Sequence, residues 1–175
     1  MSLIRGLLYW LFAVLGAASA LPALALEKTH LEIGEVLQMR DYLVAPDHKS
    51  HAVLQADGNL CVYFGDKPAK DPGQSQSLWC SGSARNTSSY YAQLRPDANL
   101  CIYRGVVPPA DGREGSSIWC WGDKTHVGGR YVLRVEGAAL CAYEFLAFSG
   151  NTTPRPPRLL WASRKLNKLS GFIAR

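Results

Sequence analysis

A repeat of about 40 residues is the feature that most constrains the fold of this chain. Three cysteines stand 40 residues apart, and similar text surrounds each of them: HAVLQADGNLCVYFG at 51–65, YAQLRPDANLCIYRG at 91–105 and YVLRVEGAALCAYEF at 131–145. A short element built around a tryptophan follows each copy, at Trp79, Trp119 and Trp161. A unit of this size cannot bury its apolar face alone, so the three copies must pack together. They span about 51–90, 91–130 and 131–165.

Each copy has the pattern of β-strands rather than helices. Apolar and polar side chains alternate over residues 59–63, and the segments within the copies are rich in proline and glycine. We therefore predict an all-β domain with pseudo-threefold symmetry, one sheet per copy, and residues 26–50 as a lead-in strand region. The shared core would contain the three tryptophans together with Leu60, Val62, Leu100, Ile102 and Leu140. Both a β-prism and a β-trefoil fit a threefold all-β chain, and the alternating row in residues 55–63 favours the prism.

The leader, residues 1–25, has the pattern of a secretory signal peptide. One charge, Arg5, precedes a long apolar run that ends in an Ala-Leu-Ala cleavage signal. We expect cleavage after Ala25, with a cut after Ala20 as the alternative, so that residues 26–175 form one domain of a secreted or periplasmic protein. If the leader were not cleaved, it would anchor the protein in a membrane.

Charge and residue spacing argue against several functions. The formal net charge is +5 at pH 7, but no aromatic-and-basic motif typical of nucleic-acid binding is present. The four histidines have no metal-ligand spacing with the cysteines, so we expect no metal and no cofactor. The carboxylates are scattered, without a paired acid and nucleophile, so we do not expect an enzyme.

Two disulfides follow from the strand pattern. Alternate residues of a strand share a face, so Cys61 should point away from the core, and Cys80, which follows the core residue Trp79, should point the same way. Neighbouring antiparallel strands would bring the two sulfur atoms within bonding distance. Disulfides are the default in an exported chain. We predict Cys61–Cys80 and, by the same pattern, Cys101–Cys120.

The third copy lacks the second cysteine of this pattern. Ala162 follows Trp161 there, which leaves Cys141 without a partner and explains the odd count of five cysteines. A buried thiol is the favoured interpretation of Cys141, and an intermolecular disulfide is the alternative.

A polar row in the first copy suggests carbohydrate recognition. Every second residue of QADGNLCVY is polar or is the cysteine, namely Gln55, Asp57, Asn59, Cys61 and Tyr63. Amide, carboxylate and phenol groups can donate to and accept from the neighbouring hydroxyls of a sugar. A shallow site of this kind would bind a monosaccharide weakly, on the order of millimolar, and useful affinity would come from multivalency. The alternative is that Asp57-Gly58-Asn59 is only a turn.

The pattern Gln-x-Asp-x-Asn-x-Val-x-Tyr resembles the signature of the bulb-type, or monocot-type, mannose-binding lectins. LEIGEVL at 31–37 is similar to that family's opening strand, LWCSG at 78–82 is similar to its Leu/Val-Trp-Ala-Ser element, and the resemblance covers roughly 30–165. It implies a β-prism of the second type with three four-stranded sheets, and calcium-independent binding of mannose or mannose-containing glycans. Many members form homodimers by exchanging a C-terminal strand, which makes a homodimer an expectation here as well.

By this resemblance, the carbohydrate-binding residues of the first copy are Gln55, Asp57, Asn59 and Tyr63, with Cys61 in place of valine. In the family, Asp and Asn bind the 2-hydroxyl of mannose, Gln the 3-hydroxyl and Tyr the 4-hydroxyl, while Val packs on the ring. The Cys61 bridge would either replace valine as an apolar floor or crowd the sugar.

The other two copies depart from the motif. A second carbohydrate site would consist of Arg95, Asp97, Asn99 and Tyr103, but Arg95 cannot accept a hydrogen bond and could pair with Asp97 instead. The third copy carries Val135, Gly137, Ala139 and Tyr143 at the same positions, so we expect no sugar binding by this mode.

These departures support an alternative hypothesis, a protein-interaction or toxin- or bacteriocin-like module on a lectin scaffold with sugar binding reduced or lost. Trp121 has no equivalent in the other copies and is either an exposed stacking platform or a partly buried surface residue. Two glycosylation sequons begin at Asn86 and Asn151.

Overall fold

The computed structural model describes residues 25–69, 76–85, 89–108, 116–122, 128–145 and 156–164. Residues 1–24 of the predicted leader, both sequon asparagines and most of the basic C-terminal tail lie outside these residues.

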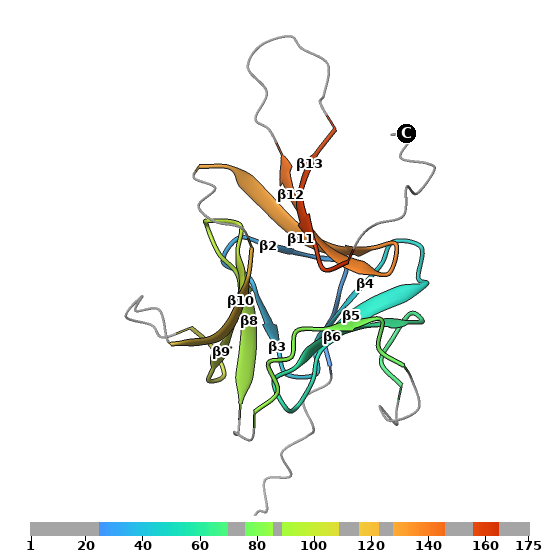
Figure 1. Cartoon of the computed structure of the whole chain (residues 1–175), viewed down its shortest axis with the longest axis vertical. Coiled ribbons are helices and arrows are strands. Elements are labelled where there is room, and N and C mark those ends of the chain that lie inside the picture. The colour runs from blue at the N-terminus through green and yellow to red at the C-terminus, as the bar shows by residue number, and fades with distance from the viewer. Residues whose placement is uncertain are drawn as a thin grey trace, which may run out of the picture.

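Strands alone make up the regular structure of the described residues. In chain order they are β1 (Glu27–Lys28), β2 (His30–Glu32), β3 (Val36–Gln38), β4 (Tyr42–Val44), β5 (Ser50–Leu54), β6 (Leu60–Phe64), β7 (Trp79–Cys80), β8 (Tyr90–Leu94), β9 (Leu100–Arg104), β10 (Ser117–Trp121), β11 (Arg130–Glu136), β12 (Ala139–Phe145) and β13 (Arg158–Ala162). They form three sheets, which Figure 1 shows as three sides around a common centre.

Each repeat supplies three consecutive antiparallel strands to its own sheet. The sheets contain β5-β6-β7, β8-β9-β10 and β11-β12-β13. The lead-in region completes all three, because β4 joins the first sheet, β3 the second and β2 the third. The predicted β-prism with three four-stranded sheets is therefore confirmed over the β-trefoil. The first sheet has one strand more than predicted, since β1 pairs in parallel with β4 at its edge.

Both predicted disulfides are present in the structure. Cys61 lies opposite Cys80 and Cys101 opposite Cys120 in antiparallel pairs, with an S–S distance of 2.05 Å in each. In the third sheet Cys141 lies opposite Ala162 and is a buried free thiol. Burial raises the pKa of this thiol to about 12, so it stays protonated and unreactive in the folded chain.

The inward faces of the three sheets meet in one core. The predicted apolar residues of β6, β9 and β12 all belong to it, and the tryptophans of β7, β10 and β13 pack against it while staying partly exposed. Trp121 joins these tryptophans, with ring-centroid distances of 5.6 Å to Trp79 and 6.3 Å to Trp161. It is therefore a partly buried member of an aromatic cluster rather than an isolated platform.

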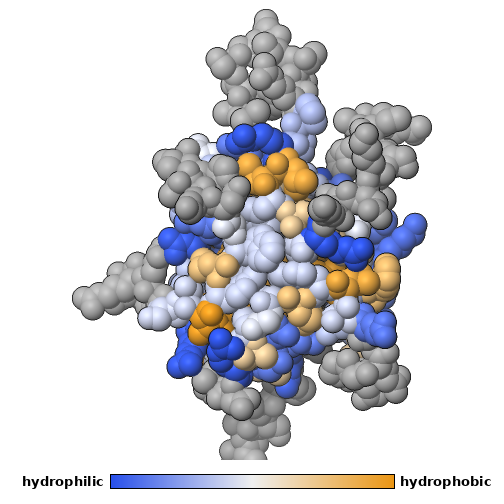
Figure 2. Space-filling view, in the orientation of Figure 1, coloured by the Kyte–Doolittle hydropathy of each residue, from blue (hydrophilic) through white to orange (hydrophobic). Residues whose placement is uncertain are grey.

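Within the described ranges, the exposed large hydrophobic residues lie in separate parts of the chain, except for one adjacent pair, Val106 and Val107. They are Leu26, Phe64, Val106, Val107 and Leu159. Figure 2 shows that, on the face viewed, hydrophobic residues form separate small patches among hydrophilic ones.

No helix within the described ranges has the length and apolar character needed to cross a bilayer.

Candidate functional site

The polar row of the first repeat begins in a tight turn between β5 and β6. The backbone N–H of Gln55 donates to the carbonyl of Asn59 at 2.8 Å, and Gly58 N–H donates to the carbonyl of Gln55 at 3.0 Å. Gly58 has a φ of +80°, which favours glycine. Residues 55–59 therefore form a turn that also carries the polar row, and strand alternation holds only from Leu60 onward.

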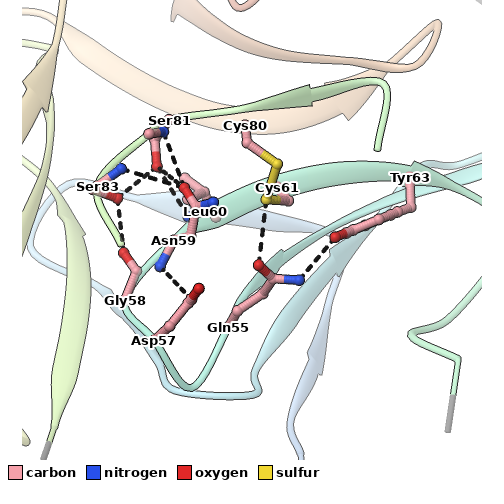
Figure 3. Close-up of a disulfide and its surroundings, with 11 residues drawn as sticks. Gln55, Asp57, Gly58, Asn59, Leu60, Cys61, Tyr63, Cys80, Ser81 and Ser83 are labelled. Atoms are coloured by element: carbon pink, nitrogen blue, oxygen red, sulfur yellow. Dashed lines mark hydrogen bonds between the residues drawn. A yellow bond between two sulfur atoms is a disulfide. The ribbon is translucent and has the colours of Figure 1, made fainter. Parts of the chain in front are cut away.

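Gln55 and Tyr63 nevertheless meet on the outer face of the first sheet. Gln55 Nε2 donates to Tyr63 Oη at 2.8 Å, while Gln55 Oε1 lies 3.4 Å from Cys61 Sγ (Figure 3). Since Cys61 is oxidised, its sulfur has no proton, and this second approach is a van der Waals contact. The Cys61–Cys80 bridge thus lies beside the Gln55 amide, at the position where the family motif has valine.

A buried histidine supports Tyr63 from the neighbouring strand. The rings of His51 and Tyr63 stack with centroids 5.7 Å apart, and His51 Nδ1 lies 2.9 Å from the carbonyl oxygen of Gly65. That carbonyl can only accept, so Nδ1 carries the proton. Burial lowers the pKa of His51, which keeps the ring neutral at pH 7.

Asn59 is held by the loop that follows β7. Its Oδ1 accepts from Ser81 Oγ at 2.9 Å, from Gly82 N–H at 3.0 Å and from Ser83 N–H at 3.3 Å (Figure 3). Backbone N–H groups only donate, so the amide orientation is fixed with oxygen toward this loop. Nδ2 is then the donor that Asn59 can offer to a ligand, because none of the described residues accepts from it.

Asp57 supplies an acceptor beside this donor. Its Oδ1 accepts from the backbone N–H of Asn59 at 2.9 Å, and the carboxylate is exposed to solvent. The first repeat therefore combines the Asn59 amide donor and the exposed Asp57 carboxylate in the turn, while Gln55 is bonded to the hydroxyl of Tyr63, whose side chain is largely buried. The loop 81–83 was not among the predicted site residues, although Ser81 and Gly82 belong to the LWCSG element that follows the first strand pair.

In the second repeat, an ion pair engages the polar side chains that would form the second carbohydrate site. Arg95 Nε lies 3.3 Å from Asp97 Oδ1, as predicted, and Arg95 Nη1 donates to Tyr103 Oη at 3.2 Å. Partial burial opposes ionisation of Asp97, but hydrogen bonds from Asn99 and the charge of Arg95 outweigh it and lower the pKa of Asp97. The carboxylate that a sugar hydroxyl would need is thus engaged within the protein.

In the third repeat, the predicted correspondence of Val135 with Gln55 is wrong by one residue. Val135 faces Leu140, as Leu54 faces Leu60, and so occupies an inward position. Glu136, not Val135, takes the place of Gln55. The reason is a shorter hairpin, in which only Gly137 and Ala138, at φ values of +54° and +63°, connect the paired strands.

Glu136 forms a closed cluster with its neighbours. Its Oε2 accepts from Tyr143 Oη at 2.5 Å and from Arg134 Nη2 at 3.0 Å. The Arg134 guanidinium also lies over the Tyr143 ring, 4.4 Å from its centroid. Burial and the bond to Glu136 raise the pKa of Tyr143. These side chains bond to one another, and Ala139 stands in the place of Asn59, so the third repeat has no Asp–Asn pair at this position.

The described ranges contain no group of three or more His, Cys, Asp or Glu side chains placed to hold a metal ion.

The fold is the β-prism II of the monocot mannose-binding lectins. A monomeric mannose-binding lectin from Gastrodia elata superposes with a TM-score of 0.52 at 21% identity, covering 78% of this chain and 96% of the lectin. A lectin from Allium sativum gives 0.52 at 22% identity, covering 70% and 99%. The snowdrop (Galanthus nivalis) agglutinin, solved with methyl-α-D-mannoside, gives 0.50 at 19% identity, covering 73% and 100%. No family model and no curated protein matches this sequence.

Proposed function

We propose that this protein is a secreted lectin that binds mannose or mannose-containing glycans, without calcium, through the first sheet. The site would consist of Gln55, Asp57, Asn59 and Tyr63. The observation that carries the proposal is the Asn59 amide, which three donors from residues 81–83 fix so that Nδ2 is available beside the exposed Asp57 carboxylate. One sugar hydroxyl can accept from such an amide and donate to such a carboxylate.

The fold and the Cys61 bridge support the same proposal. Solved proteins with this fold include one holding methyl-α-D-mannoside. The bridge lies beside Gln55 without displacing the Gln55–Tyr63 bond, so we propose that it replaces valine as an apolar floor for the sugar ring. Only the first repeat keeps the full set of polar groups, so each chain would offer one such site. Multivalent binding to a glycan would then require more than one chain. Exchange of β13 between two chains remains a proposal for how a homodimer forms.

The decisive variant is Asn59→Asp. It keeps an oxygen for the three donors of the 81–83 loop but replaces the Nδ2 donor by an acceptor. We expect at least a tenfold loss of binding to a mannose matrix or glycan array, an effect on the order of one charged or well-placed hydrogen bond. The matched control is Asn99→Asp in the second repeat, which should leave binding unchanged. Chelation of calcium should have no effect.

Full retention of mannose binding by folded Asn59→Asp would overturn the assigned site. The second candidate is a protein-interaction or toxin-like module, and the internal ion pairs Arg95–Asp97 and Arg134–Glu136 favour it, because they leave two of the three rows closed. A glycan array without a signal, together with a specific protein recovered by the wild type, would select this alternative.

A further inference from the structure

Asp41 is a buried carboxylate at the start of β4. Its side chain is nearly inaccessible, with 8% of the residue exposed, and Oδ2 accepts from the backbone N–H of Gln38 at 3.0 Å. Its other oxygen, Oδ1, accepts from the backbone nitrogen of Leu26 at 2.9 Å. Among the described residues, no lysine, arginine or histidine side chain forms an ion pair with it. A buried carboxylate is normally paired with a positive charge.

The chain is held firmly against β4 from Leu26 onward. The backbone N–H of Tyr42 donates to the carbonyl of Leu26 at 3.1 Å, and Tyr42 Oη donates to Glu27 Oε2 at 2.7 Å. Strand β1 then runs in parallel with β4, with Glu27 opposite Tyr42. The position of the Leu26 nitrogen at Asp41 is therefore set by the first sheet.

The nitrogen that contacts Asp41 belongs to the bond that the sequence pattern predicts to be cleaved. The Ala-Leu-Ala signal ends at Ala25, so a leader peptidase would cut between Ala25 and Leu26. The cleavage pattern and the hydrogen bond are independent observations, and both concern the nitrogen of the Ala25–Leu26 peptide bond.

We propose that cleavage of the Ala25–Leu26 bond creates the missing cation, and that Asp41 binds the α-ammonium group of Leu26 in the mature protein. Water adds across the bond under the action of the peptidase. The carbonyl of Ala25 becomes a carboxylate, and the nitrogen of Leu26 becomes an amine that takes up a proton at pH 7, since α-amino groups titrate near 7.7–8.0. A neutral amide donor to Asp41 thereby becomes a charged one.

The processed N-terminus then becomes part of the first sheet. The Asp41 carboxylate already makes the amide hydrogen bond charge-assisted, and the α-ammonium group adds a direct attraction between opposite charges, so removal of the leader strengthens the attachment of β1 to β4. A cut after Ala20 would instead leave Leu26 as a neutral amide and Asp41 without its cation. This inference does not depend on sugar binding.

The first measurement is the N-terminal sequence and intact mass of the protein after export of the full chain. We expect Leu26 as the first residue, and a start at any other position would overturn the proposal.

The second measurement separates charge from position on the mature protein. Selective acetylation of the α-amine removes the positive charge, whereas reductive dimethylation keeps it. We expect acetylation to raise the equilibrium constant of urea unfolding about tenfold relative to dimethylation, because the acetylated nitrogen still donates to Asp41 but no longer carries the positive charge of the ion pair. In Asp41→Asn the two modifications should differ less than twofold. Equal stability of the acetylated and dimethylated wild type would refute the proposal without any variant, so it stays testable even if Asp41→Asn does not fold.

Discussion

Ser81 connects the fold to the proposed site, and its replacement by alanine tests that connection. Its hydroxyl accepts from the backbone N–H of Leu60 at 3.0 Å. Because Ser83 Oγ donates to the Gly58 carbonyl, the Ser81 proton is shared between Asn59 Oδ1 at 2.9 Å and Ser83 Oγ at 2.6 Å. Ser81→Ala therefore removes one of the three donors that orient the Asn59 amide, and it leaves the Leu60 N–H without its acceptor.

The expected magnitudes follow from these two bonds. A buried backbone N–H without an acceptor costs about 1–3 kcal/mol of folding free energy. The Asn59 side chain keeps its bonds from Gly82 and Ser83, so the loss in binding should equal about one neutral hydrogen bond, roughly 0.5–1.5 kcal/mol. This corresponds to a two- to tenfold weaker affinity for a mannose-containing glycan.

The third repeat provides a matched control. Ser163 accepts from the backbone N–H of Leu140 at 3.0 Å, as Ser81 does from Leu60, but the residue at the Asn59 position is Ala139. Ser163→Ala should cost a similar amount of folding free energy and leave glycan binding unchanged.

The assay is urea unfolding together with glycan binding by calorimetry on wild type, Ser81→Ala and Ser163→Ala. The reasoning predicts two destabilised variants, of which only Ser81→Ala binds more weakly. Equal affinity of all three folded proteins would refute the role assigned to the 81–83 loop.

Three further predictions concern stability and reactivity. Gly58→Ala should destabilise the fold by about 2–4 kcal/mol, because the residue has a positive φ and its Cβ would lie 2.8 Å from the buried Tyr90 ring; unfolding midpoints would show this, and a stable variant would contradict it. Since burial lowers the pKa of His51, the unfolded chain binds more protons below about pH 6.5, so the free energy of unfolding should fall from pH 7 to pH 5. In His51→Tyr, which copies Tyr91 of the second sheet, that decline should be smaller, and an identical pH profile would exclude His51 as its source. The thiol of Cys141 should resist iodoacetamide at pH 8 until urea unfolds the chain, as mass spectrometry would report, and rapid labelling of the native protein would contradict its burial.

Much of the architecture could be predicted from the sequence because the repeats are regular. Three similar copies require three packed units, and alternation at Cys61 and Trp79 determines which side chains face outward. The two bridges and the unpaired Cys141 followed from that alternation together with the expectation that the two strands are antiparallel neighbours. The Arg95–Asp97 pair could likewise be predicted, because a guanidinium stood two residues from a carboxylate in the same row.

The differences arose where backbone geometry, rather than residue type, decides position. The third hairpin is one residue shorter, which moves Val135 inward and puts Glu136 at the place of Gln55. The positions of the third copy were assigned by counting residues back from Cys141, and such a count does not reveal that the turn between the two strands is shorter. The bonds at Asn59 were also hidden, since they come from a loop more than 20 residues away in the chain.

The distribution of the lead-in strands has a consequence for the order of events during biosynthesis. Strand β2 is among the first segments to be synthesised, yet Leu31 pairs with Leu133 of the last repeat. The third sheet cannot close until nearly the whole chain has left the ribosome, and pairings this distant in sequence form slowly. Strand β2 is thus among the last segments to be secured, although β1, directly before it, can pair with β4 as soon as the first sheet begins to form.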